Sequence, residues 1–220
     1  MSFFAVLTED GSYALTSAGY TVLTVIMLAM LVGACYFTKA DQKIKMGTRH
    51  LMFASIALAL AYVTSFIKLF EMPMGGAVTF FSVFFITLVG YWYGLGPGLL
   101  AATAYGILQL IIDPYIISLP QMFFDYIFAF GALGLSGLFT NSKYGMIKGY
   151  LVAIFGRFVF SFLSGVIFFG MYAPEGMNPA VYSAVYNGSY IAAEGVITII
   201  LLMIPAVSNA LKKVKNMATA

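Results

Sequence analysis

The sequence predicts an all-α fold of the polytopic membrane class, a bundle of helices that cross a lipid bilayer. Three observations lead to this class. First, 62% of the 220 residues are hydrophobic and only 9% are charged, whereas a soluble domain needs roughly 25% charged residues to cover its surface. Second, the chain contains seven apolar runs, most of them long enough to cross about 30 Å of hydrocarbon. Third, the basic residues gather at one end of these runs.

In chain order, the apolar runs predict seven transmembrane helices. The first run follows Glu9 and Asp10 rather than basic residues and is long enough to span, which favours a membrane helix over a signal peptide. Only the short, uncharged break from Gly94 to Gly98 separates the third run from the fourth. The runs are continuous rather than alternating, which excludes a transmembrane β-barrel. The predicted helices cover residues 14–37, 51–70, 77–93, 98–112, 121–139, 147–172 and 180–204.

The distribution of charge predicts the orientation of the chain. If seven helices alternate across the membrane, nine of the eleven basic residues lie on one side. They are Lys39, Lys43, Lys45, Arg49, Lys143, Lys148, Lys212, Lys213 and Lys215. The other side carries five acidic residues and one lysine, namely Glu9, Asp10, Glu71, Asp113, Glu175 and Lys68. The positive-inside rule therefore predicts an N-terminus outside and a C-terminus in the cytoplasm. A net charge of only +3, spread over these flanking segments, argues against nucleic-acid binding.

Three ionisable residues remain inside the predicted spans: Asp125, Arg157 and Glu194. A charge in the bilayer is costly unless it is paired or solvated, so each needs a reason. Arg157 and Glu194 each lie ten residues from the cytoplasmic end of their helices, which places both at a depth of about 15 Å. This matching depth on consecutive antiparallel helices predicts a structural Arg157–Glu194 ion pair.

Asp125 has no such partner and lies near the outer end of its predicted helix. One interpretation is an interfacial carboxylate that faces water. The other is a carboxylate that lines an outward-facing pocket among aromatic residues and binds an organic cation.

Two helical faces favour the pocket. Ser183, Asn187, Tyr190 and Glu194 repeat at helical spacing, and so do Arg157, Ser161 and Ser164. Individually such residues can serve as hydrogen-bonding contacts between helices or as an interfacial tyrosine belt. Their convergence from three helices on the outer half of the membrane favours a ligand site.

Small residues predict close helix packing at two places. In the second predicted helix, Ser55/Ala59 and Ala57/Ala61 have the small-xxx-small spacing that lets another helix approach, either a partner's or one of this bundle. The run from Gly131 to Gly137 is rich in glycine, and there internal packing is the expected use.

Several function classes have no support in the sequence. No P-loop motif is present, so the chain does not bind ATP in that manner. Cys35 is the single cysteine, which excludes a disulfide within the chain and a Cys-rich metal site. His50 is the single histidine, and no metal cluster or histidine-containing acid–base pair is visible. We therefore expect no cofactor, no metal and no enzymatic activity, and the residues alone indicate a membrane protein with an outward pocket for a polar or cationic aromatic molecule.

From His50 to the C-terminus, the chain resembles the thiamine-specific substrate-binding (S) components of energy-coupling factor (ECF) vitamin transporters, and the resemblance covers about 160 of the 220 residues. The matching stretches are Met72-Pro-Met-Gly-Gly-Ala77, Tyr105-Gly-Ile-Leu-Gln109, Asp113-Pro-Tyr115 through Pro120 to Phe130, Gly156-Arg-Phe158, Ser164 to Gly176 and Tyr182 to Tyr190. The resemblance implies a six-helix substrate-binding domain over residues 48–220, preceded by an extra helix and a basic loop over residues 1–47. It also implies uptake through a bacterial cell membrane with a membrane scaffold (T) subunit and two ABC-type ATPase subunits.

The same resemblance assigns substrate binding to seven positions: Tyr115, Asp125, Tyr126, Ser161, Phe169, Tyr182 and Asn187. Asp125 stands where family members carry Asp or Glu facing the thiazolium, and Phe169 where they carry an aromatic residue that stacks on the ligand. The scaffold is expected to dock on Ser55, Ala59 and Ala61.

Two features depart from the family: Ser161 replaces a family histidine, and the first helix is extra. The vitamin therefore stays open between thiamine and a related compound such as hydroxymethylpyrimidine or pyridoxine. An autonomous small-molecule carrier and a membrane structural or sensor protein remain alternative roles.

Overall fold

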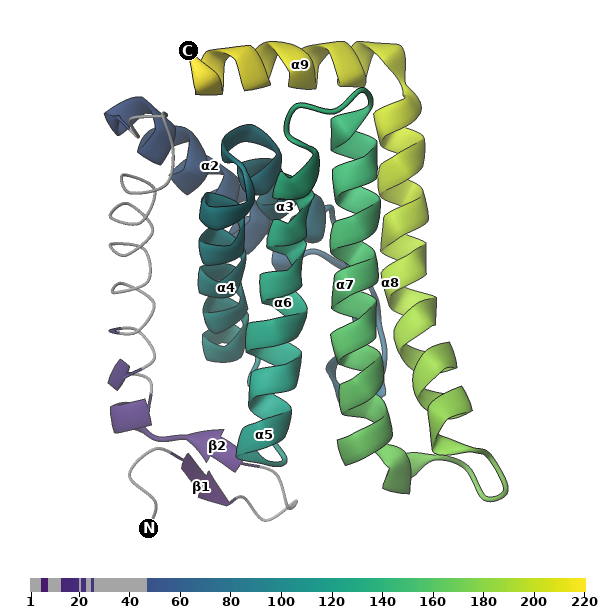
Figure 1. Ribbon diagram of the computed structural model, residues 1–220. Coiled ribbons are helices and arrows are strands. Elements are labelled where there is room, and N and C mark those ends of the chain that lie inside the picture. Colours follow the sequence, from purple (N-terminus) through teal and green to yellow (C-terminus); the bar gives the residue numbers. More distant parts are fainter. Residues whose placement is uncertain (1–4, 8–12, 20, 23–24, 26–46) are drawn as a thin grey trace.

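A computed structural model describes residues 5–7, 13–19, 21–22, 25 and 47–220 of the chain. In this part, long helices run side by side to form a bundle, and a last helix lies across one end of it (Figure 1). Four helical stretches are long and apolar enough to cross a membrane: Leu95–Ile112, Leu119–Phe139, Gly145–Phe168 and Pro179–Met203. The predicted class, a helical membrane bundle, is confirmed.

The first two helices of the bundle are shorter than predicted. Helix α2 covers Thr48–Ser65 and α3 covers Ser82–Tyr93, whereas the sequence predicted helices over 51–70 and 77–93. An antiparallel hairpin of β3 (Lys68–Glu71) and β4 (Ala77–Thr79) occupies the residues between them. Its turn contains the short helix η1 (Pro73–Gly75), where Met74 and Gly75 have positive φ angles of 66° and 89°. Short strands at the ends of apolar runs cannot be distinguished from helix ends by hydropathy alone, which explains why the predicted helix boundaries at residues 70 and 77 were wrong.

Helix α4 (Leu95–Ile112) begins directly after Gly94, three residues earlier than expected. The next helical stretch changes its winding along its length. It consists of α5 (Leu119–Met122), the π-helical η2 (Phe123–Phe128), α6 (Ala129–Gly131) and the 3-10 helix η3 (Ala132–Phe139). The hydroxyl of Ser118 caps its start by accepting from the Gln121 amide at 3.3 Å.

Glycines bring α3, α4 and η3 into backbone contact. A Cβ at Gly134 would lie 2.3 Å from the Leu99 amide nitrogen, and one at Gly98 would lie 2.6 Å from the Gly90 Cα. The expected internal packing of the run from Gly131 to Gly137 is therefore confirmed. This contact forms the part of the bundle core away from the candidate site.

The second half of the bundle consists of α7 (Gly145–Phe168), the short η4 (Gly170–Tyr172) and α8 (Pro179–Met203). At Ile204 and Pro205 the chain turns sharply into α9 (Pro205–Thr219), which crosses the end of the bundle (Figure 1). Leu211, Val214 and Ala218 of α9 pack against the core, and the Tyr93 hydroxyl donates to the Ala218 carbonyl at 3.2 Å. The sequence predicted no helix after residue 204, where it placed only the cytoplasmic Lys212, Lys213 and Lys215.

The structure describes only the first residues of the predicted N-terminal helix and so tests that prediction only there. Two short strands, β1 (Ala5–Leu7) and β2 (Tyr13–Leu15), pair antiparallel, so the start of the predicted helix at residue 14 falls in a strand. Most of the remaining residues of the predicted helix 14–37 lie outside the described residues, and the division into residues 1–47 and 48–220 stays a prediction.

Candidate functional site

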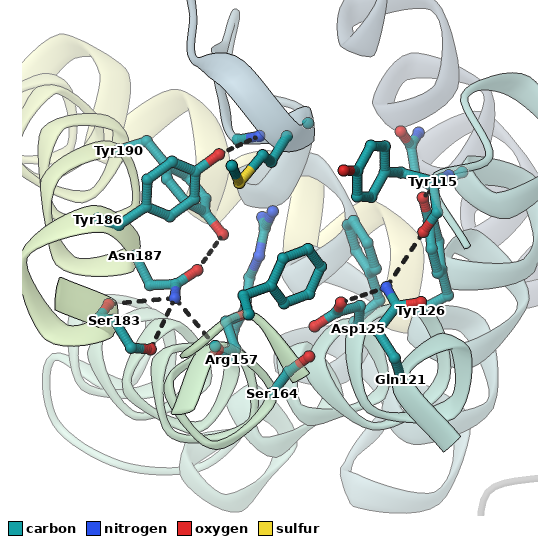
Figure 2. A pocket seen from close by; sticks show the side chains of 18 of the residues that line it. Tyr115, Gln121, Asp125, Tyr126, Arg157, Ser164, Ser183, Tyr186, Asn187 and Tyr190 are labelled. Atoms are coloured by element: carbon teal, nitrogen blue, oxygen red, sulfur yellow. Dashed lines mark hydrogen bonds between the residues drawn. The ribbon is translucent and has the colours of Figure 1, made fainter. Parts of the chain in front are cut away.

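A cavity of about 140 Å³ lies between α4, the α5–η2 stretch, α7, α8 and the turn that follows β3 (Figure 2). All seven residues to which the family resemblance assigned substrate binding line this cavity. They are Tyr115, Asp125, Tyr126, Ser161, Phe169, Tyr182 and Asn187. Their places in one cavity agree with the prediction of a three-helix pocket, while their roles in binding stay predictions.

Asp125 lies in the π-helical segment η2 and turns its carboxylate toward the cavity (Figure 2). The Gln121 amide nitrogen donates to its Oδ2 atom at 2.6 Å. Gln121 is itself buried and fixed, because it also donates to the Tyr115 carbonyl and accepts from the Ile117 amide, both at 3.1 Å. Since π-helical turns are frequent at functional sites, the local winding agrees with a ligand-binding role for Asp125.

Aromatic side chains form the walls beside the carboxylate. The Tyr126 hydroxyl accepts from the Tyr115 amide at 2.8 Å and donates to the Asp113 carbonyl at 2.9 Å, which ties η2 to the end of α4. The rings of Tyr115 and Phe169 are nearly parallel, with centroids 6.0 Å apart. Such faces can hold an aromatic or cationic ligand.

Helices α7 and α8 meet at the opposite wall through Asn187. Its amide nitrogen donates to the carbonyl of Ser161 and to the carbonyl and hydroxyl of Ser183 at 3.1 to 3.2 Å, while its oxygen accepts from the Tyr190 hydroxyl at 3.0 Å. The helices can approach this closely because Gly165 has no side chain: a Cβ there would lie 2.1 Å from the Ser183 hydroxyl. The protein itself therefore uses most of the hydrogen-bonding capacity of Asn187.

The turn after β3 covers one end of the cavity. The Tyr186 hydroxyl of α8 accepts from the Gly76 amide at 3.1 Å and donates to the Pro73 carbonyl. The Tyr182 hydroxyl contacts the Met74 sulfur at 3.8 Å. At the rim, Lys68 binds the carboxylates of Asp113 at 2.9 Å and Glu71 at 2.7 Å, and these hydrogen bonds raise the pKa of Lys68.

The predicted ion pair between Arg157 and Glu194 is not formed in the described part of the chain, where the ion pairs join Lys68 to Glu71 and Asp113. Glu194 instead accepts from the Thr79 amide and hydroxyl at 3.0 to 3.1 Å and from the Val83 amide at 3.3 Å. The Arg157 guanidinium lies over the Phe130 ring, 4.6 Å from its centroid, and faces the main cavity. Both charged residues also line a second cavity of about 70 Å³. Equal depth in the membrane therefore does not bring Arg157 and Glu194 into contact, because donors on β4 and α3 bind the Glu194 carboxylate instead.

Sequence reasoning missed several residues that line the cavity, among them Met74, Gly75, Gly76, Gln109, Phe130 and Tyr186. The turn residues could not be found from helical spacing, since they belong to the hairpin that the sequence did not predict. Tyr186 carried a signal, because it flanks the polar face of α8. Among the described residues, no group of His, Cys, Asp or Glu is arranged to hold a metal ion.

Comparisons with known proteins identify a family and a fold that this chain shares. A family described as thiamine transporter protein matches residues 51–214. The chain is 32% identical over 146 residues to the thiamine transporter ThiT of Bacillus subtilis, covering 60% of this chain and 76% of that protein. It is 29% identical over 170 residues to the thiamine transporter ThiT of Lacticaseibacillus paracasei, covering 69% and 81%. A solved structure of ThiT from Listeria monocytogenes superimposes with a TM-score of 0.57 at 24% identity, over 72% of this chain and 96% of that one, which shows the shared fold.

Proposed function

The chain belongs to the thiamine transporter protein family, and from that premise we propose that it binds thiamine from outside a bacterial cell. In this proposal it is the substrate-binding subunit of an ATP-driven importer of the energy-coupling factor type. Its N-terminus lies outside and its C-terminus in the cytoplasm, as the positions of the basic residues favour.

The single observation that supports this ligand is the Asp125 carboxylate in a cavity with aromatic walls. Thiamine carries a permanent positive charge on an aromatic thiazolium ring. A carboxylate attracts this charge strongly where water is scarce, and aromatic faces add cation–π contact. A neutral ligand would bring no positive charge into direct contact with Asp125, which belongs to none of the ion pairs of the described residues.

The energy for uptake comes from other subunits in this proposal. The chain has no P-loop motif, so two ABC-type ATPase subunits supply ATP hydrolysis and a membrane scaffold subunit connects them to this chain. Ser55 and Ala59, which are exposed on α2, belong to the surface that the scaffold contacts.

A related vitamin or precursor is the second candidate ligand, because Ser161 stands where the family carries a histidine. Serine is shorter and cannot stack, so the part of the ligand near α7 is held differently. Pyridoxine and hydroxymethylpyrimidine lack the thiazolium charge, and this difference separates the candidates.

Calorimetric titration of the detergent-purified chain tests the proposal. We expect saturable binding of thiamine and much weaker binding of hydroxymethylpyrimidine and pyridoxine. Tighter binding of either neutral compound would assign the site to that ligand. Uptake of thiamine into liposomes by the chain alone would instead support an autonomous carrier, and a folded chain that binds none of the three compounds would refute a vitamin-binding role.

A further inference from the structure

The Ser164 hydroxyl is a buried polar group that makes no well-formed hydrogen bond among the residues that the structure describes, although it lies close enough to the Asp125 carboxylate to interact with it. Ser164 lies on α7, is only 1% exposed and lines the cavity. In Figure 2 its hydroxyl points into the same space as the Asp125 carboxylate. Buried hydroxyls are normally paired, and an unpaired one is a candidate for binding a ligand atom.

Two polar neighbours of Ser164 in the cavity, Gln121 and Asn187, have their hydrogen bonds made within the protein. The protein itself binds the amide groups of Gln121 and Asn187 at both their nitrogen and their oxygen atoms. Gln121 uses Oδ2 of Asp125, which leaves Oδ1 for a ligand. The Ser164 hydroxyl and this carboxylate oxygen are therefore two neighbouring acceptors on one side of the cavity.

We infer that Ser164 is a specificity-determining residue that, with Asp125, binds an amino group of the ligand. An aromatic amino group carries two N–H donors and can donate one to each oxygen. This inference rests on the proposed function, because the pyrimidine ring of thiamine bears such an amino group. A single methylene joins the pyrimidine to the thiazolium, so one carboxylate can lie near both the amino group and the positive charge.

The same arrangement excludes a ligand with an oxygen in place of the amino group. A carbonyl oxygen would place its lone pairs against Asp125 and could accept only from Ser164. Sites built to bind N–H or O–H groups discriminate strongly in this way, because a mismatch leaves buried polar groups unpaired. Ser164 would therefore contribute to the choice between two ligands of almost the same shape.

The test compares thiamine with oxythiamine, the analogue that carries a carbonyl oxygen in place of the amino group, on the full chain and on Ser164→Ala. For thiamine we expect Ser164→Ala to weaken binding about 3- to 10-fold, the effect of one lost hydrogen bond. Oxythiamine should bind the wild type poorly, and Ser164→Ala should change its affinity less than that of thiamine. The ratio of thiamine affinity to oxythiamine affinity should therefore be lower in Ser164→Ala than in the wild type. Ser164→Cys, which keeps the size but accepts hydrogen bonds weakly, should lie between the two proteins.

Folding is controlled separately. Ser164→Ala removes no well-formed hydrogen bond within the protein, only the interaction of the hydroxyl with the Asp125 carboxylate, so its melting temperature should change little. Ser136→Ala removes a buried hydroxyl that donates to the Thr87 carbonyl at 2.7 Å outside the cavity, and it should lower stability without changing the affinity ratio. Equal losses for both ligands in Ser164→Ala, or no loss for thiamine, would overturn the inference while the proposed function stands. A folded wild type that does not bind thiamine would overturn both.

Discussion

Asp125 occupies its position because three local features act together: the π-helical turn, the Gln121 hydrogen bond and the aromatic walls. Asp125→Asn keeps the shape of the side chain and deletes its charge. We expect thiamine affinity to fall about 10- to 150-fold, equivalent to about 1.5–3 kcal/mol for a charge-assisted interaction. Calorimetry measures the affinity and thermal unfolding the stability, which should change little. Wild-type affinity in this variant would refute the assignment.

Glu194 has a structural role in the same membrane region, although not the one the sequence suggested. Its carboxylate accepts from Thr79 and Val83 and so joins α8 to the hairpin and to α3. In Glu194→Gln an amide NH₂ group replaces one acceptor oxygen and faces donors, so at least one hydrogen bond is lost. We expect a loss of about 1–3 kcal/mol in unfolding free energy.

Thermal unfolding with Glu175→Gln as an exposed control measures this loss. An unchanged melting temperature in Glu194→Gln would show that the carboxylate is dispensable for packing. A fall in thiamine affinity without a fall in stability would instead place Glu194 in the binding site.

At the scale of elements, the contact of η3 with α4 depends on the absence of a side chain at Gly134. The closest atoms to an added Cβ belong to the Leu99 backbone and cannot rotate away. Gly134→Ala should therefore destabilise the chain by about 1–3 kcal/mol, the usual cost of overpacking. Gly96→Ala is the matched control, since a Cβ there meets nothing within 4 Å. Equal melting temperatures for the two variants would contradict this packing.

Helix α2 presents two different faces, and this corrects the predicted docking surface. Ser55 and Ala59 are exposed, whereas Ala61 is 0% exposed and packs in the core. Residues two positions apart lie about 200° apart around a helix, so Ala59 and Ala61 cannot share a face. A docking surface on α2 can include Ser55 and Ala59 but not Ala61.

Ala59→Trp tests this surface. In the complete transporter it should abolish uptake of labelled thiamine while the isolated subunit still binds thiamine with wild-type affinity, because the large ring blocks close approach of a partner helix. Ala57, which is 1% exposed, provides the contrast: Ala57→Trp should impair folding itself. Normal uptake by Ala59→Trp would exclude this face from docking.

Particular elements show what the sequence can and cannot predict. Helical spacing and family resemblance identified seven residues of one cavity. Five of them lie on helices whose polar faces must avoid lipid, whereas Tyr115 and Phe169 follow the ends of α4 and α7 and were found by the resemblance alone. The β3–β4 hairpin was missed because its strands are only four and three residues long and lie at the ends of the apolar runs on either side. The Arg157–Glu194 pair was wrong because depth along a helix does not specify the direction of a side chain. Helix α9 carried a readable signal in the spacing of Leu211, Val214 and Ala218, which pack on the bundle.

At the scale of the whole molecule, the comparisons confirm the helical membrane bundle that composition and apolar runs predicted, and the transporter family, not a family of enzymes, that the resemblance predicted. The structure adds that the cavity lies toward the end of the bundle that carries Asp113, Glu71 and Lys68, and away from α9. A cavity displaced toward one end of the bundle suits a subunit that collects its ligand on one side of the membrane, as proposed above.

Orientation of the molecule in the membrane gives the last prediction, which depends on the asymmetry of the basic residues. A variant without Cys35 provides a background free of native thiols, into which single cysteines are placed at Glu9, Glu175 and Lys213. In intact cells, a membrane-impermeant maleimide should label cysteines at positions 9 and 175 and fail to label the one at position 213. After the membrane is permeabilised, all three should react. Labelling of position 213 alone in intact cells would invert the orientation. Labelling at position 175 without position 9 would leave the six-helix bundle in place but refute a seventh crossing by residues 14–37. The reason is that an odd number of crossings is needed to place the N-terminus outside when the C-terminus is in the cytoplasm.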